Sequence, residues 1–209
     1  MNVLKNKRLR SVFFIFCLSA LANSEPLTSD NFVATGAQNS VVLVAVNWGR
    51  QWSCGSYENA QLMKLGFINL ATKGAITLES PSKLRVKSEF VDYGYIVEPG
   101  EYAFSEYSIK VAKSATDVSY LSANQDRLLP DNSPKGGTFS VKPGEVAYVG
   151  HFALDCYEEP IPWRYYPEGV DGFAAYTDSV KKKFAYLKAS DISFTILNTT
   201  LFGTPYKLP

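Results

Sequence analysis

The pattern of apolar positions along the chain predicts a mainly β protein. Residues 41–48 form one continuous apolar run rich in β-branched side chains, which is typical of a strand buried on both faces. Apolar and polar residues then alternate at 93–97 and at 192–196, which is the two-residue period of half-buried strands. We therefore expect an antiparallel β-sandwich or open barrel with one C-terminal helix, formed by a single β-rich domain over residues 38–209.

Shorter apolar runs predict further strands, and polar stretches predict the connections between strands. Residues 62–70 and 75–78 fit two strands separated by a Lys-Gly turn. Residues 49–59 are polar and predict a loop. Residues 112–137 are rich in Ser, Asn, Asp, Pro and Gly, so we expect a long, mobile connection of the kind that often carries binding sites.

The phase of the apolar positions slips once within the chain. Tyr102 and Phe104 share one phase, whereas Tyr107 and Ile109 share the opposite phase. A single extra residue in a strand produces such a slip, because side chains alternate between the two faces. The sequence therefore predicts a β-bulge near Ser105-Glu106.

Two segments, 97–104 and 141–148, share the pattern Val-x-Pro-Gly-Glu-x-Ala-aromatic. Proline presets the first central position of a turn, and glycine supplies the positive φ that a type II turn needs at the second. We expect a hairpin at each segment. Either two hairpins use the same turn chemistry, or two equivalent edges form a site.

One amphipathic helix is predicted near the C-terminus. Asp178 is a suitable N-cap, and Val180, Phe184 and Leu187 recur at helical spacing on one face. Four lysines lie mostly off that face, which suits a solvated surface, although a lysine run also allows contact with a polyanion or a membrane.

The first residues have the pattern of a secretory signal. Residues 1–22 contain four basic side chains, a short apolar run and a small-x-small cleavage site. The apolar run is shorter than the roughly 20 residues that span a bilayer, although an uncleaved anchor is an alternative. A lipoprotein is disfavoured, because Cys17 lies inside the apolar run and follows a bulky phenylalanine. Residues 23–37 are polar and predict a flexible N-terminal lead.

Removal of residues 1–22 changes the charge of the protein. The whole chain has 21 basic and 20 acidic residues, whereas the remaining chain has 17 basic and 20 acidic residues, a formal charge of −3. A mildly acidic protein has no overall attraction for nucleic acid or anionic lipid. We expect no nucleic-acid partner and no transmembrane segment after signal cleavage.

The cysteine count also simplifies without the signal. Cys54 and Cys156 remain, and two cysteines in an exported chain suggest one disulfide. Two free thiols and a half-built metal site are the alternatives. Neither cysteine has a second cysteine or histidine at metal-ligand spacing, so we expect no metal and no cofactor.

His151 is the one histidine of the chain and the one candidate imidazole base. No serine lies in a G-x-S-x-G pattern, and a disulfide would remove both thiols as nucleophiles. A histidine at the end of a strand is more often structural or solvated, but a hydrolase that uses His151 remains an alternative.

Acidic residues gather around Cys156. Paired carboxylates perform glycosidic chemistry, and oxygen ligands bind calcium, but the spacing fits no EF-hand loop. Solvated loop residues are the simpler interpretation. The residues concerned are Asp155, Glu158, Glu159, Glu168 and Asp171.

The stretch Pro-Ile-Pro-Trp-Arg-Tyr-Tyr suggests a binding loop. The rings of Trp163, Tyr165 and Tyr166 could present a flat surface in a segment stiffened by prolines, and Arg164 could pair with an acidic group. The alternative is that these side chains pack over the edge of the sandwich beside Cys156.

The two Pro-Gly segments carry a resemblance to a known class of proteins. Residues 99–102 (Pro-Gly-Glu-Tyr) and 143–150 (Pro-Gly-Glu-x-x-Tyr-x-Gly) resemble strand ends of small exported bacterial β-domain proteins of unknown function. The resemblance implies a β-sandwich-like domain of the bacterial envelope and brings no catalytic residue.

These observations favour an exported, periplasmic or secreted, non-catalytic binding or assembly module. Its sheet edges or residues 163–166 would contact an envelope protein or a polysaccharide. The alternatives are a hydrolase acting on envelope material, through His151 or carboxylates near Cys156, and a carbohydrate-binding module with exposed, coplanar aromatic rings.

Overall fold

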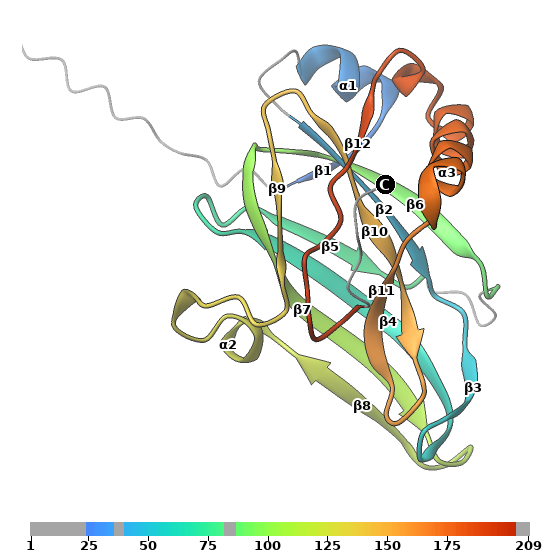
Figure 1. Ribbon diagram of the computed structural model, residues 1–209. Helices are drawn as coiled ribbons and strands as arrows, with labels where there is room; N and C mark the ends of the chain where they lie inside the picture. Colours follow the sequence, from blue (N-terminus) through green and yellow to red (C-terminus); the bar gives the residue numbers. More distant parts are fainter. Residues whose placement is uncertain (1–23, 36–39, 82–86, 204–209) are drawn as a thin grey trace, which may run out of the picture.

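The computed structural model describes residues 24–35, 40–81 and 87–203, and these residues form two β-sheets packed together (Figure 1). The predicted class, a mainly β protein with a sandwich architecture and a C-terminal helix, is confirmed. The predicted signal peptide, residues 1–22, lies outside the described residues.

Sheet A has the order β1-β6-β2-β10-β11, with β12 beside β10. The β2–β10 and β10–β12 pairs are parallel, and the other pairs are antiparallel. The strand β2 lies between two neighbours and is buried over nearly its whole length, as the apolar run predicts. The strands are β1 (Glu25–Pro26), β2 (Ser40–Asn47), β6 (Phe90–Val97), β10 (Val146–Asp155), β11 (Ile161–Tyr165) and β12 (Ile192–Phe194).

Sheet B is antiparallel throughout and is built on the long central pair β4–β7. Strands β3 and β5 share the far edge of β4, and β8 and β9 share the far edge of β7. The strands are β3 (Gln51–Cys54), β4 (Tyr57–Asn69), β5 (Ala75–Glu79), β7 (Gly100–Ala112), β8 (Val118–Ala123) and β9 (Thr138–Val141).

The predicted bulge is present in β7. Gly66 of β4 lies opposite Glu106, and the next residue, Phe67, lies opposite Phe104. Ser105 is therefore the extra residue, and it is buried. The bulge lets Phe104 and Tyr107 both reach the core side of the sheet.

Aromatic rings from both sheets fill the space between them. Phe67 of β4 packs against Phe104, Phe139 and Phe152, with ring centroids 5.5–5.7 Å apart. Phe152 belongs to β10 of sheet A, so these contacts cross the two layers. Burial of one such side chain stabilises the fold by about 1.5–3 kcal/mol.

Helices cover part of the outer face of sheet A. The helix α3 (Gly169–Lys183) and the short turns α1 (Ser29–Thr35) and η3 (Ala185–Leu187) form a second apolar layer with β2, β6 and β10. This layer explains why β2 is buried on both faces. Within the described part of the chain, no helix is long and apolar enough to cross a membrane.

The predicted position of the helix is wrong at its start. The helix begins at Gly169, with Glu168 as the N-cap, rather than at Asp178. Phe173, Tyr176 and Val180 continue the apolar stripe toward the N-terminus, but glycines among the first residues hide the helical pattern. Val180 is buried as predicted, and Leu187 lies beyond the helix in η3.

Three segments that the sequence predicts to be loops or leads have regular structure. Residues 49–59 contain β3 and its hairpin with β4. Residues 112–137 contain β8, the single-turn helix α2 (Gln125–Leu128) and η2 (Pro130–Asn132). Residues 24–35 contain β1 and α1, held in place by the buried Leu27. Exposed strands and short helices lack the apolar periodicity that sequence patterns detect.

The two Pro-Gly segments are not hairpins within one sheet. The first joins β6 of sheet A to β7 of sheet B, and the second joins β9 of sheet B to β10 of sheet A. Gly144 has a φ of 73°, as a type II turn requires, whereas Gly100 has a φ of 150° and already begins β7. Both segments are therefore crossings between the layers.

Candidate binding groove

The edge strand β8 presents unpaired backbone groups. Its one partner among the described residues is β7. The Lys113 N–H donates to the Asp117 carbonyl at 3.0 Å, which sets the phase of the hydrogen bonds in this hairpin. Because antiparallel pairs alternate, the backbone N–H and C=O groups of Val118, Tyr120 and Ser122 point away from β7.

The side chains of β8 alternate between the two faces of sheet B. Leu121 lies opposite the fully buried Ile109, so it faces the core side. Tyr120 and Ser122 lie opposite Lys110 and Ser108 and face the outside. Tyr120 is 61% exposed.

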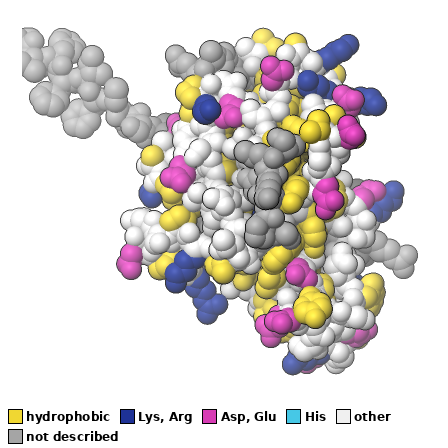
Figure 2. All heavy atoms as spheres, in the orientation of Figure 1, with side chains coloured by type: hydrophobic (Ala, Val, Ile, Leu, Met, Phe, Trp, Pro, Cys, Tyr) yellow, Lys and Arg dark blue, Asp and Glu magenta, His cyan; other side chains and the backbone are white. Residues whose placement is uncertain are grey.

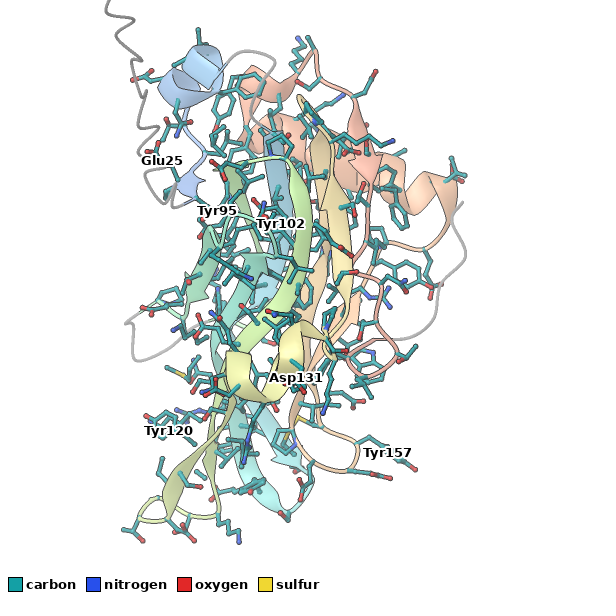
Figure 3. All side chains as sticks on the ribbon, turned by 90° about the vertical axis from the view of Figure 1, so that its left-hand side faces the viewer. Glu25, Tyr95, Tyr102, Tyr120, Asp131 and Tyr157 are labelled. Carbon is teal, nitrogen blue, oxygen red and sulfur yellow. A yellow bond between two sulfur atoms is a disulfide. The ribbon has the colours of Figure 1, made fainter. Side chains whose placement is uncertain are left out.

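A groove of about 810 Å³ opens beside this free edge. Tyr107, Tyr120 and Leu121 line it from sheet B, and Pro160 and Ile161, at and just before the start of β11, line it from the other side. The lining therefore includes residues from both faces of β8 and from the edge of sheet A. Figure 3 labels Tyr120 on β8 and Tyr157 on the β10–β11 turn, at the same end of the sandwich.

Some charged side chains of the groove form an ion pair within the described chain, and others do not. Lys64 and Glu106 form an ion pair of 2.8 Å with each other. Arg127 forms no ion pair with any other described residue. Its charge acts on Tyr107 instead: burial raises the pKa of the Tyr107 hydroxyl, and the positive charge of Arg127 partly opposes that rise. Glu159 precedes the opposite wall and likewise has no ion pair within the described chain.

A disulfide fixes the turn that carries the second wall. Cys54 and Cys156 are bonded, as predicted, with their Cα atoms 4.4 Å apart. The Gly55 N–H donates to the Cys156 carbonyl at 3.2 Å. Gly55 has a φ of 60°, and a Cβ there would lie 2.0 Å from the Glu158 carbonyl oxygen, so the close approach of the two turns requires glycine.

Three of the predicted binding residues, Trp163, Arg164 and Tyr165, lie on the strand β11 rather than on a loop, Tyr166 directly follows it, and their side chains point in different directions. Trp163 and Tyr165 lie opposite Ala153 and His151, on the outer face of sheet A. Tyr165 is 40% exposed, and Trp163 is half-buried. Trp163 and Tyr165 therefore share one face of β11.

The other two predicted residues pack into the protein. Arg164 is 1% exposed and lies opposite Phe152 on the core side. Glycines make room for its side chain, since a Cβ at position 203 would lie 2.7 Å from its Nη2 atom. Its guanidinium lies 5.5 Å from the Tyr166 ring, which in turn packs edge-on against Phe194. The structure thus separates Arg164 and Tyr166 from the exposed rings.

His151 is enclosed beneath α3. Its Nδ1 atom is hydrogen-bonded to the Tyr148 hydroxyl, and the rings of Phe90 and Tyr176 pack edge-on against it. Burial lowers the pKa of His151 to about 4, so the ring is neutral at pH 7. The imidazole is thus hydrogen-bonded to a tyrosine, whose own pKa burial raises, rather than to a serine or cysteine nucleophile.

The acidic residues near Cys156 do not converge. Asp155 accepts a hydrogen bond from the Tyr157 N–H at 3.0 Å, within the β10–β11 turn. Glu168 and Asp171 lie at the start of α3 instead. No group of three or more His, Cys, Asp or Glu side chains in the described part of the chain is arranged to hold a metal ion.

The sequence pattern does not reveal the residues of the groove. Tyr120, Leu121 and Arg127 fall in the stretch that is predicted to be a loop, because turn-forming residues flank it on both sides. The detectable signal is Val-Ser-Tyr-Leu-Ser-Ala, which contains strand formers and no charge. Pro160 and Ile161 belong to the stretch that the sequence predicts to be a binding loop. That prediction rests on the aromatic rings of the stretch, however, and not on these two residues.

The fold and groove define a two-layer β-sandwich in which the edge strand β8 borders a groove. No protein-family model matches the chain, and no curated protein and no solved structure was found to match it.

Proposed function

We propose that this protein is an exported, non-catalytic binding or assembly module of the bacterial envelope, and that it captures an extended polypeptide segment along β8. The observation that carries the proposal is the free edge of β8 opening into a groove of about 810 Å³. An extended segment that adds to a sheet edge gains backbone hydrogen bonds, and the adjoining groove selects its side chains.

The partial protection of the edges of β6 and β11 supports this choice. Along β6, Pro26 of β1 covers one part, and the Lys183 ammonium donates to the Asp92 carbonyl at 2.7 Å further along. Beside β11, the backbone N–H of Arg164 donates to the Phe202 carbonyl at 2.5 Å. Proline, lysine and covering segments are the usual means of blocking edge-to-edge pairing. The exposed edge of β8 carries no charged residue and no proline.

Export is supported by the disulfide together with the predicted signal. Disulfides persist in oxidising compartments and are rare in the cytosol. The surface is consistent with a protein partner rather than with a polyanion, because acidic and basic side chains are interspersed over the face shown in Figure 2.

The hydrolase and carbohydrate alternatives gain no support from the site. His151 is held by Tyr148 between aromatic rings. The rings of residues 163–166 do not form one platform, since Tyr166 packs against Phe194 and Trp163 is half-buried.

The test uses a matched pair of variants at an outward-facing position of β8. Ser122→Pro removes one N–H that an added strand needs, without removing a bond to β7, whereas Ser122→Ala keeps that N–H. Peptides displayed on phage are selected on the immobilised wild-type protein and then measured against both variants. We expect at least tenfold weaker binding by Ser122→Pro and unchanged binding by Ser122→Ala, with the same thermal unfolding temperature.

Hydrogen exchange supplies an independent measurement. A bound peptide should slow exchange of the Tyr120 and Ser122 amides more than exchange of the amides that already bond to β7. Equal binding by both variants, or failure to select any peptide, would overturn the proposal.

A further inference from the structure

We infer, building on the proposed function, that the segment captured by β8 is an amphipathic β-strand with an acidic residue at the end nearest α2. Its alternate apolar side chains would enter the gap between β8 and β11. Its other side chains would be polar and would lie beside Tyr120 and Ser122.

The alternation follows from the geometry of the edge. An added strand lies in the plane of sheet B, because it bonds to the outward backbone groups of Val118, Tyr120 and Ser122. Successive side chains of that strand then point to opposite faces of the sheet. One set faces the core side with Leu121, and the other faces the outside.

The core-side environment is apolar. Leu121, Tyr107 and Ala123 pack against the main core from sheet B. The buried Pro160 lines the groove from the other side, just before β11. A polar side chain placed between these walls would lose hydrogen bonds to water, so this set of positions requires apolar residues.

The outer environment is polar, and the charged residues that line the groove on this face, Lys64 and Glu106, are paired with each other. Ser108 and Ser122 offer hydroxyl groups, and the ion pair of Lys64 and Glu106 satisfies both charges. A charged side chain gains little at this position, whereas serine or threonine can hydrogen-bond. Short polar residues are therefore expected at the alternate positions.

Arg127 and Glu159 carry the unpaired charges of the groove lining in the described chain. Arg127 belongs to α2, which follows the C-terminal end of β8. Glu159 belongs to the turn before β11, and each has no ion pair within the described chain. An acidic residue is therefore favoured near Arg127 and disfavoured near Glu159, which gives the captured strand a direction.

The test uses synthetic nine-residue peptides as probes. The reference peptide has valine at every second position, threonine or serine between them, and an aspartate at one end with a lysine at the other. A second peptide exchanges the two charges. A third has the same composition with the valines grouped together. Affinities are measured by fluorescence anisotropy with the full protein.

We expect the better of the two alternating peptides to bind at least tenfold more tightly than the grouped peptide. Exchange of the end charges should change the affinity about fivefold, and Arg127→Gln should remove that difference. Equal affinities for alternating and grouped peptides would overturn the alternation, and a charge effect that survives Arg127→Gln would overturn the assigned direction.

Protein variants separate this inference from the proposed function. Leu121→Ser and Pro160→Ser change the two sides of the groove independently, while Ser122→Ala serves as the control on the outer face. Loss of binding in both wall variants, with thermal unfolding retained in at least one, supports the inference. Suppose that Ser122→Pro abolishes binding, but that the two wall variants and the grouped peptide bind as well as the wild type and the alternating peptide do. This result would overturn the inference and leave the proposed function standing. Binding that is indifferent to Ser122→Pro would overturn the proposed function.

Discussion

Gly100 lies directly opposite Val141 in the β7–β9 ladder, so the two Val-x-Pro-Gly-Glu segments meet side by side. One crosses from sheet A to sheet B and the other crosses back. A Cβ at Gly100 would lie 2.7 Å from Nδ2 of Asn69, a buried residue whose Oδ1 accepts hydrogen bonds from the N–H groups of residues 71 and 72. The shared motif therefore joins the two layers at one place, which is a structural role.

Substitution of Gly55 tests the contact between the two disulfide-linked turns. Gly55→Ala places a methyl group 2.0 Å from the Glu158 carbonyl oxygen at a positive φ, so we expect a loss of roughly 2–4 kcal/mol in the free energy of unfolding. Gly169→Ala is the matched control, because Gly169 has a φ of 69° but a Cβ there would meet no atom within 4 Å. That control should cost about 1 kcal/mol. Urea denaturation measures both, and equal losses would contradict the steric account.

Removal of the disulfide should lower stability substantially. Cys54 and Cys156 are 102 residues apart, and the chain-entropy model gives about 4–5 kcal/mol for a loop of this length. The double variant Cys54→Ala/Cys156→Ala and the reduced wild-type protein should therefore unfold at similar, lower urea concentrations. A denaturation midpoint that does not move when reductant is added would contradict this expectation.

The stability of the protein should depend on pH through His151. Its pKa is about 4 in the folded protein and about 6.5 when unfolded, so the unfolded chain binds the proton more tightly. The contribution is complete above pH 6.5 and is lost as the pH falls toward 4, by up to about 3 kcal/mol. Asp92 acts in the opposite direction, because burial raises the pKa of its carboxyl group.

The variant His151→Gln isolates this effect. It retains Asp92, so the difference between its pH profile and that of the wild type reports the histidine alone. The measurement is the free energy of unfolding between pH 4 and pH 7. Parallel profiles for the two proteins would show that His151 does not carry the dependence.

Trp163 should not contribute to capture along β8. Its side chain lies on the outer face of sheet A, whereas the groove uses Pro160, which precedes the same strand. Trp163→Ala should leave peptide affinity within about twofold, while Pro160→Ser lowers it. Loss of affinity in Trp163→Ala would contradict this prediction and would support a binding site at residues 163–166.

Strong patterns are enough to predict the buried part of this fold. The continuous run of β2, the bulge at Ser105 and the Cys54–Cys156 bond all follow from the sequence, because burial, side-chain alternation and cysteine count leave direct traces in it. The exposed strand β8 leaves a weaker trace, since Val118 and Tyr120 are exposed and only Leu121 and Ala123 pack against the core. Its role depends on an unpaired edge, which a sequence pattern does not show.

The sequence pattern also does not predict the direction in which each side chain points. Residues 163–166 form one aromatic cluster in sequence, yet the strand sends Arg164 into the protein and Tyr165 out of it. The start of α3 escapes prediction for a related reason, since glycines interrupt the helical propensity while Tyr176 still packs on Tyr148. In both cases neighbours distant in the chain decide the outcome.

The parallel pair β2–β10 also affects how the chain folds, because its two strands are far apart in the sequence. Val41 is matched with Val146, about a hundred residues later in the chain. Such distant pairing gives a high contact order and slow folding. During synthesis, the β-branched segment 40–47 therefore emerges before both of its partners, β6 and, much later, β10. It is then the stretch most exposed to aggregation, and the one that a chaperone would have to cover.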